Sequence, residues 1–307
     1  MRQLGCTMAV YACVRHCCAG LLFLSATAFG AENGLEQISN LSDQQFHEVQ
    51  LKASRGDRTS EAILAIAYEQ GIHVLKNDAE AAKWYRRLAE AGSVEAQNRM
   101  GILCQFGRGV PQDYSDAADW FRKAATMGNA AAQSNLAMLY LNGWGVSRDL
   151  EQAAKWYEVA ARQGDRNAQN NLAYLYSNSE GVAQDKARAA YWYRLAAAQG
   201  ESLAALNLGL LYEEGAGEPP NEAEALRWFE KAAAAGVARA FSNEARLYMF
   251  GKQTPHDYAR ALELLKAAVA GGDEVVRPWL QLCREQMAKA NPALAEAASS
   301  KPAPNQR

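Results

Sequence analysis

The residues that most often carry chemistry are sparse in this 307-residue chain and stand far apart. His47, His73 and His256 are scattered, and none has a second histidine or a cysteine at the spacing of a zinc site. The sequence also lacks a phosphate-binding G-x-x-x-x-G-K, a nucleophile elbow G-x-S-x-G, and a serine followed three residues later by lysine. We therefore predict no catalytic residues, no metal site and no cofactor.

Glycine pairs in the segments GRGV (107–110) and GWGV (143–146) are the one pattern that resembles a nucleotide loop. They return in successive units, always before a segment with helical periodicity. A nucleotide-binding fingerprint follows a strand and stands once in a domain. These glycines therefore indicate turns between repeated elements, where a positive φ is needed.

A period of 36 residues connects these elements. It relates the tryptophans, and the next step falls on a leucine: Trp84, Trp120, Trp156, Trp192, Trp228 and Leu264. An alanine stands three residues before each of these positions, an Asn or Asp seven residues before it, and a glycine eight residues after it. Four columns in register over six copies indicate a repeat array.

Each column has a role in one helix. The Asn or Asp is a predicted N-cap, the alanines and the tryptophan share one helical face, and the glycine ends the helix in a left-handed turn. The predicted N-caps are Asn77, Asp113, Asp149, Asp185, Asn221 and Asp257. The predicted end glycines are Gly92, Gly128, Gly164, Gly200, Gly236 and Gly272, with Gly56 one period earlier.

A second amphipathic segment precedes each capped helix. In AQSNLAMLYLNG (132–143), Ala132, Leu136, Leu139 and Tyr140 form one apolar stripe. A column of tyrosines marks this segment, and a cysteine replaces it in the second unit: Tyr68, Cys104, Tyr140, Tyr176, Tyr212 and Tyr248. Two helices cannot bury both of their apolar faces alone, so the units must stack. We expect the tryptophans to fill the space between units, where Trp→Ala would cost about 3–5 kcal/mol.

The pattern A-x-x-x-L-G/A-x-x-Y-x-x-G-x-G-V-x-x-D-x-x-x-A-x-x-W-Y/F-x-x-A-A-x-x-G at this period resembles the Sel-1-like repeat, a relative of the tetratricopeptide repeat. The resemblance implies an all-α fold, a right-handed α/α superhelical solenoid of about six 36-residue helix-loop-helix repeats with capping helices. The fifth loop, GAGEPPN, and the sixth, GKQTPHD, lack the valine of the pattern. These departures leave the curvature of the C-terminal end open.

The predicted organisation follows from the register of the columns. Residues 1–30 are a signal peptide, and 31–56 are an N-terminal capping segment with a degenerate half-repeat. The six repeats span 57–92, 93–128, 129–164, 165–200, 201–236 and 237–272. A polar-faced capping helix covers 273–290, and residues 291–307, rich in Ala and Pro, form a disordered tail.

The first 30 residues have the features of an export signal. Arg2 and Arg15 precede a short apolar run, and the sequence A-T-A ends at Ala28. The run is short for a bilayer span, so we expect cleavage near Ala28 or Gly30 and no stable membrane span afterwards. A retained signal anchor is the alternative. Cleavage would leave Cys104 and Cys283, which we expect to be buried apolar residues rather than a disulfide.

Composition excludes some partners. Hydrophobic residues make up 49% of the chain, and its net charge is -2. Loss of the two signal arginines would make that charge 30 − 34 = −4. Neither value favours nucleic acid or an anionic membrane surface. We expect a monomer that binds a protein or peptide.

The resemblance also implies a binding face, because the first helix of each unit lines the concave side of related arrays. Carried over by position, the face comprises Asn98, Ile102, Phe106, Ser134, Met138, Asn142, Asn170, Tyr174 and Asn178. Within each unit these residues stand four apart and share a stripe. Asparagines could pair with the backbone of an extended peptide while the apolar residues receive its side chains. Solvated variable surface is the alternative.

Trp144 lies outside the tryptophan period, in the third loop. The repeat does not require it there. It either packs on the neighbouring unit, which we favour, or is exposed as a contact residue.

The sequence therefore favours a periplasmic or secreted, non-enzymatic interaction scaffold for envelope assembly, signalling regulation or host contact. A binder of peptidoglycan or of exopolysaccharide in export machinery is one alternative. An enzyme is the other, because some members of the family that pair two cysteines per unit are named as β-lactamases. This chain lacks those cysteine pairs.

Overall fold

The computed structural model describes residues 33–215 and 219–290, so the predicted signal peptide and C-terminal tail lie outside the described residues. Within these ranges the regular elements are 15 α-helices and one 3-10 helix, with no strand. The predicted all-α class is confirmed.

The chain divides into two compact units. The first contains the residues up to Leu139 and Gly143–Ser147, and the second contains Tyr140–Asn142 and the residues from Arg148 onward. The helices of the first unit are α2 (Asn33–Ser39), α3 (Asp43–Ser54), α4 (Arg58–Gln70), α5 (Asp78–Glu90), α6 (Val94–Phe106) and α7 (Tyr114–Thr126). Helix α8 (Ala130–Asn142) lies across the division. The second unit holds α9 (Leu150–Arg162), α10 (Arg166–Asn178), α11 (Lys186–Ala198), α12 (Ser202–Glu214), α13 (Glu222–Ala234), α14 (Ala238–Phe250), α15 (Tyr258–Ala270), η2 (Glu274–Val276) and α16 (Arg277–Ala290).

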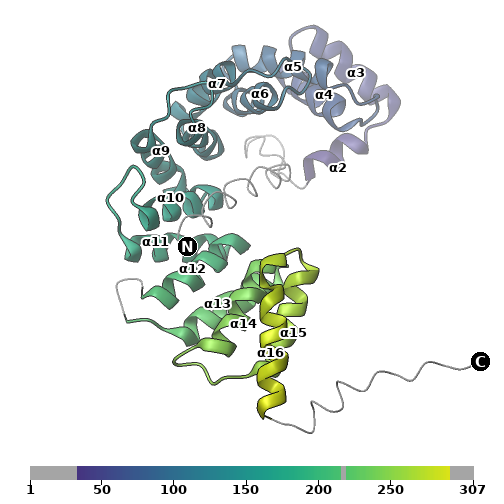
Figure 1. Cartoon of the computed structure of the whole chain (residues 1–307). Coiled ribbons are helices and arrows are strands. Elements are labelled where there is room, and N and C mark those ends of the chain that lie inside the picture. Colours follow the sequence, from purple (N-terminus) through teal and green to yellow (C-terminus); the bar gives the residue numbers. More distant parts are fainter. Residues whose placement is uncertain (1–32, 216–218, 291–307) are drawn as a thin grey trace, which may run out of the picture. The chain divides into compact units, whose positions relative to one another are not determined.

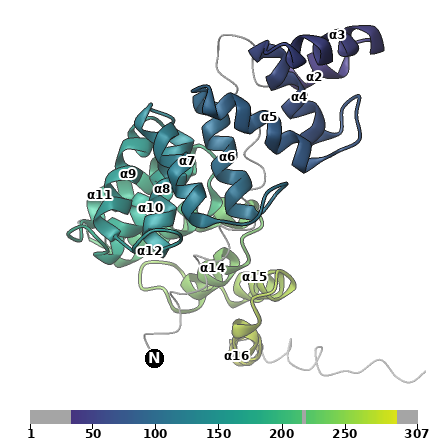
Figure 2. The same ribbon diagram turned by 90° about the horizontal axis from the view of Figure 1, so that it is seen from above.

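Neighbours in the chain are neighbours in space within each unit. Helices α3 to α7 pack consecutively in the first unit, and α9 to α16 do so in the second (Figures 1 and 2). Each repeat therefore has a first helix (α4, α6, α8, α10, α12 or α14) and a second, capped helix (α5, α7, α9, α11, α13 or α15).

The predicted N-caps are confirmed in all six second helices, where the Asn or Asp side chain accepts backbone N–H groups of the first turn. The backbone of the same residues also closes the loop. In each repeat the N–H of the cap residue donates to the carbonyl of the tyrosine column, from Asn77 to Tyr68 through Asp257 to Tyr248, at 2.8–3.0 Å. One residue thus fixes both the helix start and the return of the loop.

Two further polar columns belong to the first helices, and the second of them connects successive repeats. The first helices begin at caps of their own: Asp57, Ser93, Asn129 and Asp165 accept a backbone N–H, whereas Glu201 and Val237 do not. Buried glutamines then donate to carbonyls of the preceding second helix, at 3.0–3.2 Å: Gln97 to Ala89, Gln133 to Ala125 and Gln169 to Ala161. Both columns are incomplete toward the C-terminal end, where the side-chain cap is missing at Val237 and Phe241 replaces the glutamine.

The tryptophans are not the main interior residues that the sequence suggested. Trp120 is 9% exposed, and the other four are half-buried. Lys123, Arg87 and Lys231 lie over the rings of Trp120, Trp84 and Trp228. The next residue along each helix is the buried one, at 6% exposure or less: Tyr85, Phe121, Tyr157, Tyr193, Phe229 and Leu265. The large cost of truncation therefore belongs to this second column.

The buried ring faces a small residue of the first helix in the same repeat. A Cβ on Gly101 would lie 2.5 Å from the Phe121 ring, and a Cβ on Gly209 would lie 2.5 Å from the Phe229 ring. The corresponding residue is alanine where the buried side chain is tyrosine or leucine, as in Ala245 and Leu265. The type of the buried side chain and the type of the residue facing it thus vary together from repeat to repeat.

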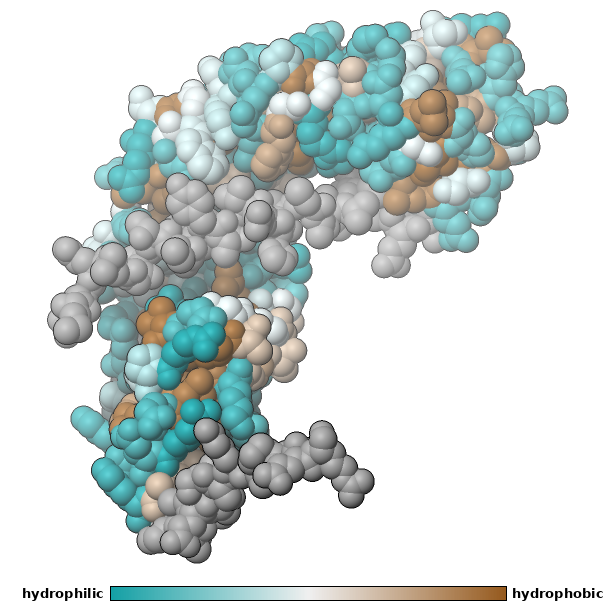
Figure 3. All heavy atoms as spheres, turned by 45° about the vertical axis from the view of Figure 1, so that its right-hand side comes forward, coloured by the Kyte–Doolittle hydropathy of each residue, from teal (hydrophilic) through white to brown (hydrophobic). Residues whose placement is uncertain are grey.

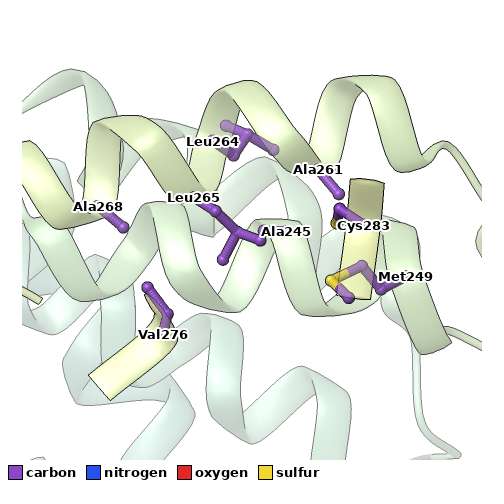
Figure 4. Close-up of a cluster of buried hydrophobic side chains, with 8 residues drawn as sticks. All are labelled: Ala245, Met249, Ala261, Leu264, Leu265, Ala268, Val276 and Cys283. Atoms are coloured by element: carbon purple, nitrogen blue, oxygen red, sulfur yellow. The ribbon is translucent and has the colours of Figure 1, made fainter. Parts of the chain in front are cut away.

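The two ends of the array are half-repeats. At the N-terminal end, α3 begins at the capping box of Ser42 and buries Ala53, and His73 stacks on Phe46 with ring centroids 4.8 Å apart. At the other end, α16 covers a cluster that includes Leu265, Val276, Met249 and Cys283 (Figure 4). Leu265 points between the helices toward Ala245, and Met249 lies beside Cys283 (Figure 4). The outer face of α16 is polar, as expected for a cap, with Arg277, Gln281, Arg284, Glu285 and Lys289 exposed.

Gly209→Ala should destabilise the protein by about 1–3 kcal/mol, because the new methyl group overlaps the Phe229 ring. Adding Phe229→Leu should recover part of this loss, because the pair then matches Ala245 and Leu265 of the sixth repeat. Urea denaturation of the two single variants and the double variant measures the coupling. Purely additive losses would contradict the matched-pair interpretation.

Val237→Asn should stabilise the protein by about 1 kcal/mol. Val237 has the extended backbone of an N-cap, with φ −76° and ψ 102°, but no side-chain oxygen for the free N–H groups of α14. Thermal unfolding beside Ser93→Ala, which removes an existing cap and should destabilise, checks the assignment. No gain from Val237→Asn would show that the first turn of α14 is satisfied in another way.

Candidate partner-binding face

The first unit contains five of the predicted face residues, on α6 and α8. Asn98 and Ile102 are half-buried, and Phe106 is 40% exposed. Met138 is half-buried, but Ser134 is only 8% exposed and offers a partner little surface, because it lies within the packed helices. One hydrogen bond connects the two helices, from Asn135 Nδ2 to Asn98 Oδ1 at 3.2 Å. Asn135, one position along from Ser134, was not among the predicted face residues.

The remaining face residues belong to the second unit. Asn142, Asn170 and Tyr174 are half-buried, and Asn178 is exposed. Asn178 donates to the Tyr174 carbonyl at 2.9 Å, and Tyr174 donates to Glu180 at 3.4 Å. These three α10 residues therefore remain a surface stripe.

Asn170 differs from its neighbours in its hydrogen bonds. Its Nδ2 donates to Asn171 Oδ1 at 3.3 Å. Its Oδ1 is inaccessible to solvent and accepts no hydrogen bond from any residue that the structure describes. A buried acceptor without a donor is costly, and native proteins contain few of them.

The adjacent column of asparagines was not predicted as part of the face. Its members stand 36 residues apart, at Asn135, Asn171, Asn207 and Asn243. In the described part of the second unit, Nδ2 of Asn243 is also buried without an acceptor. The first helices of that unit thus hold an unsatisfied donor and an unsatisfied acceptor.

In the second repeat an arginine takes the place of this asparagine. Arg99 forms an ion pair with buried Glu69 of the preceding first helix, and its Nε lies 3.2 Å from Oε2 of Glu69. Tyr85 donates to the same carboxylate at 2.8 Å, and Arg108 lies 3.4 Å from it. Burial, together with the Glu69 charge, raises the pKa of the Tyr85 phenol far above its usual range. The charge of Arg99 is thus neutralised inside the repeat contact.

Trp144 packs on the preceding repeat, as the sequence favoured. It is half-buried, and its ring centroid lies 5.4 Å from that of Tyr114 at an angle of 37°. Residues 30 positions apart meet here, as they do where Arg108 approaches Asp78 at 3.5 Å. The loop residue between the two glycines therefore contacts the start of the preceding second helix.

The apolar surface is distributed in separate patches. Figure 3 shows brown patches bounded by teal hydrophilic surface on the side that it presents. Among the described residues, no group of three or more His, Cys, Asp or Glu side chains is placed to hold a metal ion. No helix of residues 33–215 or 219–290 has both the length and the apolar character for a bilayer span. Cys104 and Cys283 are free and buried.

A scan against family models matches the Sel1 repeat six times, at residues 60–93, 94–129, 130–165, 166–201, 202–237 and 245–273. The sixth match begins late, at residue 245 within helix α14. Repeats of this family generally mediate contacts between proteins.

Two solved structures are similar over most of the chain. One is c5321 of uropathogenic Escherichia coli, described as a protective antigen with an SLR fold, at 32% identity and a TM-score of 0.74 over 80% of this chain and 52% of that one. The chain thus spans about half the length of that protein. The other is a Sel1 repeat protein from Oxalobacter formigenes, at 26% identity and a TM-score of 0.66 over 77% of this chain and 95% of that one. The comparison with curated proteins gives no match. With six matched repeats over most of its described length, the chain belongs to the Sel1 repeat family.

Proposed function

We propose that this chain is an exported, non-catalytic scaffold that binds an extended segment of a protein partner on its first helices. The partner would lie across successive repeats within a unit and contact one stripe from each. Export rests on the N-terminal residues, and binding rests on the described face.

The composition of the face favours a peptide. In the first unit it combines the amide of Asn98 with the apolar side chains of Ile102, Phe106 and Met138. Amides can donate to and accept from a peptide backbone, and apolar side chains can contact alternate residues of an extended segment.

The charge of the face favours an uncharged segment. Arg99 is the cation next to Asn98, and the buried Glu69 carboxylate already neutralises it. An anionic ligand would have to compete with that ion pair in a largely desolvated place, at a high cost.

The unsatisfied oxygen of Asn170 is the observation that carries the proposal. If the Asn170 side chain turns toward the surface on binding, a backbone N–H of the bound segment supplies the donor that the buried Oδ1 lacks in the described structure. In the same unit, the unsatisfied Nδ2 of Asn243 could donate to a backbone carbonyl of the segment in the same way. A peptide backbone offers both groups, which a purely apolar partner does not.

Asn170→Ala tests this interpretation, because it separates binding from folding. The variant should retain its stability or gain slightly, since it removes an unsatisfied acceptor. It should weaken binding of the partner about tenfold, which corresponds to about 1.4 kcal/mol. Binding and thermal unfolding are measured on the same preparations.

The partner is first identified by photo-crosslinking in envelope extract, with the crosslinking residue at Phe106 or Tyr174. The matched control site is Tyr191, an aromatic residue of α11 that is 52% exposed. One stoichiometric protein is expected from the two face positions and not from the control. Crosslinks from position 191 alone, or a loss of stability without a loss of binding in Asn170→Ala, would contradict the proposal. Retention on insoluble cell wall without a protein partner would favour a polysaccharide binder instead.

Export is tested on the full-length chain. Mass spectrometry of the protein expressed in a bacterium should find a mature N-terminus after Ala28 or Gly30, in the periplasmic or extracellular fraction. The description of the similar E. coli protein as a protective antigen agrees with an exported location. An intact N-terminus in the cytoplasmic fraction would contradict it.

A further inference from the structure

The repeats are joined at their loops by a close approach of glycine. In three loops the second glycine lies against the start of the preceding second helix. A Cβ at Gly109 would be 2.0 Å from the Asp78 carbonyl oxygen, and Cβ atoms at Gly145 and Gly181 would lie 2.2 Å from the backbone of Tyr114 and Leu150. No other residue type fits this contact, so the glycine decides how the loop meets the neighbouring repeat.

The sixth loop has a different connection. Gln253 stands where the period requires the glycine, and the first glycine of the loop, Gly251, has a φ of −59° instead of a left-handed value. The residue at the start of the preceding second helix is Glu222, which is 8% exposed. Its Oε1 accepts the backbone N–H of Lys252 at 2.8 Å.

The second carboxylate oxygen completes the contact. Oε2 of Glu222 accepts the N–H groups of Gln253 and Thr254 at 2.8 Å and the Thr254 hydroxyl at 2.9 Å. Gln253 returns the contact, because its Oε1 accepts the N–H of Glu222 at 3.2 Å and its Nε2 donates to the Pro220 carbonyl at 3.0 Å. Three successive N–H groups thus surround one carboxylate, as in the backbone nests that bind anions.

We propose that this contact is an acid-sensitive latch, and that protonation of Glu222 releases the loop Lys252–Thr254 and loosens the sixth repeat from the fifth. An ionised carboxylate only accepts hydrogen bonds, which suits four donors. A protonated one carries an O–H that must face one of those donors, so at least one hydrogen bond is lost and the nest no longer surrounds a charge.

The direction of the pH effect follows from the environment of Glu222. Burial alone would raise its pKa, but the hydrogen bonds from Lys252, Gln253 and Thr254 outweigh burial and hold the pKa below its usual value of 4.5. A lowered pKa in the folded state means that the stabilisation is complete above about pH 4.5 and is lost as the pH falls through the folded-state value. The latch is therefore closed at neutral pH.

The other titratable groups nearby have separate partners. On α13, Glu224 pairs with Arg227 at 2.7 Å. In the loop, Lys252 is exposed, and a ring nitrogen of His256 lies 3.1 Å from the Gly251 carbonyl. Asp257 caps α15. The carboxylate is thus held by backbone dipoles and a hydroxyl, which do not titrate in this range.

One other polar contact joins these two repeats, an ion pair in which Nη1 of Arg246 on α14 lies 2.5 Å from Oε1 of Glu213 on α12. The first helix of the sixth repeat has no side-chain cap at Val237, and Phe241 stands where the second, third and fourth repeats have the connecting glutamine. One protonation can therefore affect this repeat contact more than the contacts among the first four repeats, each of which carries a cap, a glutamine and a glycine loop.

Hydrogen exchange of the full-length chain, followed by mass spectrometry between pH 7 and pH 3, tests the latch. Rates are corrected for the intrinsic effect of pH. Peptides covering 251–257 should lose at least tenfold of their protection at acid pH, while peptides of the loop at 107–113 keep theirs. Simultaneous loss in both loops would indicate general acid unfolding and overturn the proposal, as would constant protection at 251–257.

Glu222→Gln provides the neutral state at every pH. Its loop should be unprotected already at pH 7 and should show no further change on acidification. Glu224→Gln, on the same helix but with a half-buried side chain that pairs with Arg227, is the matched control and should behave like the unaltered protein. Should Glu222→Gln fail to fold, Glu222→Asp keeps the charge on a shorter side chain and should show reduced protection with the same acid transition. Full protection in Glu222→Gln, or no acid transition in Glu222→Asp, would overturn the proposal.

Discussion

A pair of 13-residue helices is too short to bury both of its apolar faces, and the rest of this structure depends on that constraint. Within each repeat the side chain after the tryptophan, or after Leu264 in the sixth, fills the space between the helices, and Phe229 does so against a residue as small as Gly209. The outer sides of the helices can then be covered only by the next repeat. Glutamine side chains and ion pairs connect the repeats, because each of these polar groups would otherwise lie unpaired inside such a contact. The loop glycines connect them through the close approach of their backbones.

The periodic columns predicted the secondary structure well, because caps and turns are local. Asp149 caps its own helix and Gly164 adopts a positive φ of 93° whatever surrounds them. The period could not decide which of two adjacent aromatic residues is buried, since Trp228 and Phe229 recur together. That choice depends on the angle at which the helices of one repeat meet. The same holds for the 30-residue offset that brings Arg108 to Asp78 and Trp144 to Tyr114, which becomes visible only when the repeats are stacked.

The positions of the face residues could be predicted from the repeat, but their burial and their hydrogen-bond partners could not. Carrying a stripe over from related arrays found Phe106 and Asn178, which are exposed, and also Ser134, which is buried. Whether an asparagine is satisfied depends on its neighbours in three dimensions. Asn98 receives a donor from Asn135, whereas the acceptor of Asn170 has none among the described residues, although both occupy the same column. Likewise, the sequence shows Arg99 as a free cation, and only the structure pairs it with Glu69.

The repeat that departs most from the pattern carries its ionisable groups in unusual places. Glu244 occupies the column that holds leucine or methionine in the other repeats, and it is 1% exposed with Arg260 at 3.4 Å. Burial raises the pKa of Glu244, so its ionisation opposes folding and acidification favours the interior of the sixth repeat. Acidification acts in the opposite direction on Glu222, whose pKa is lowered. Glu244 lies inside the sixth repeat, and Glu222 joins that repeat to the fifth. Acidification would therefore weaken the contact between the two repeats while it favours the interior of the sixth.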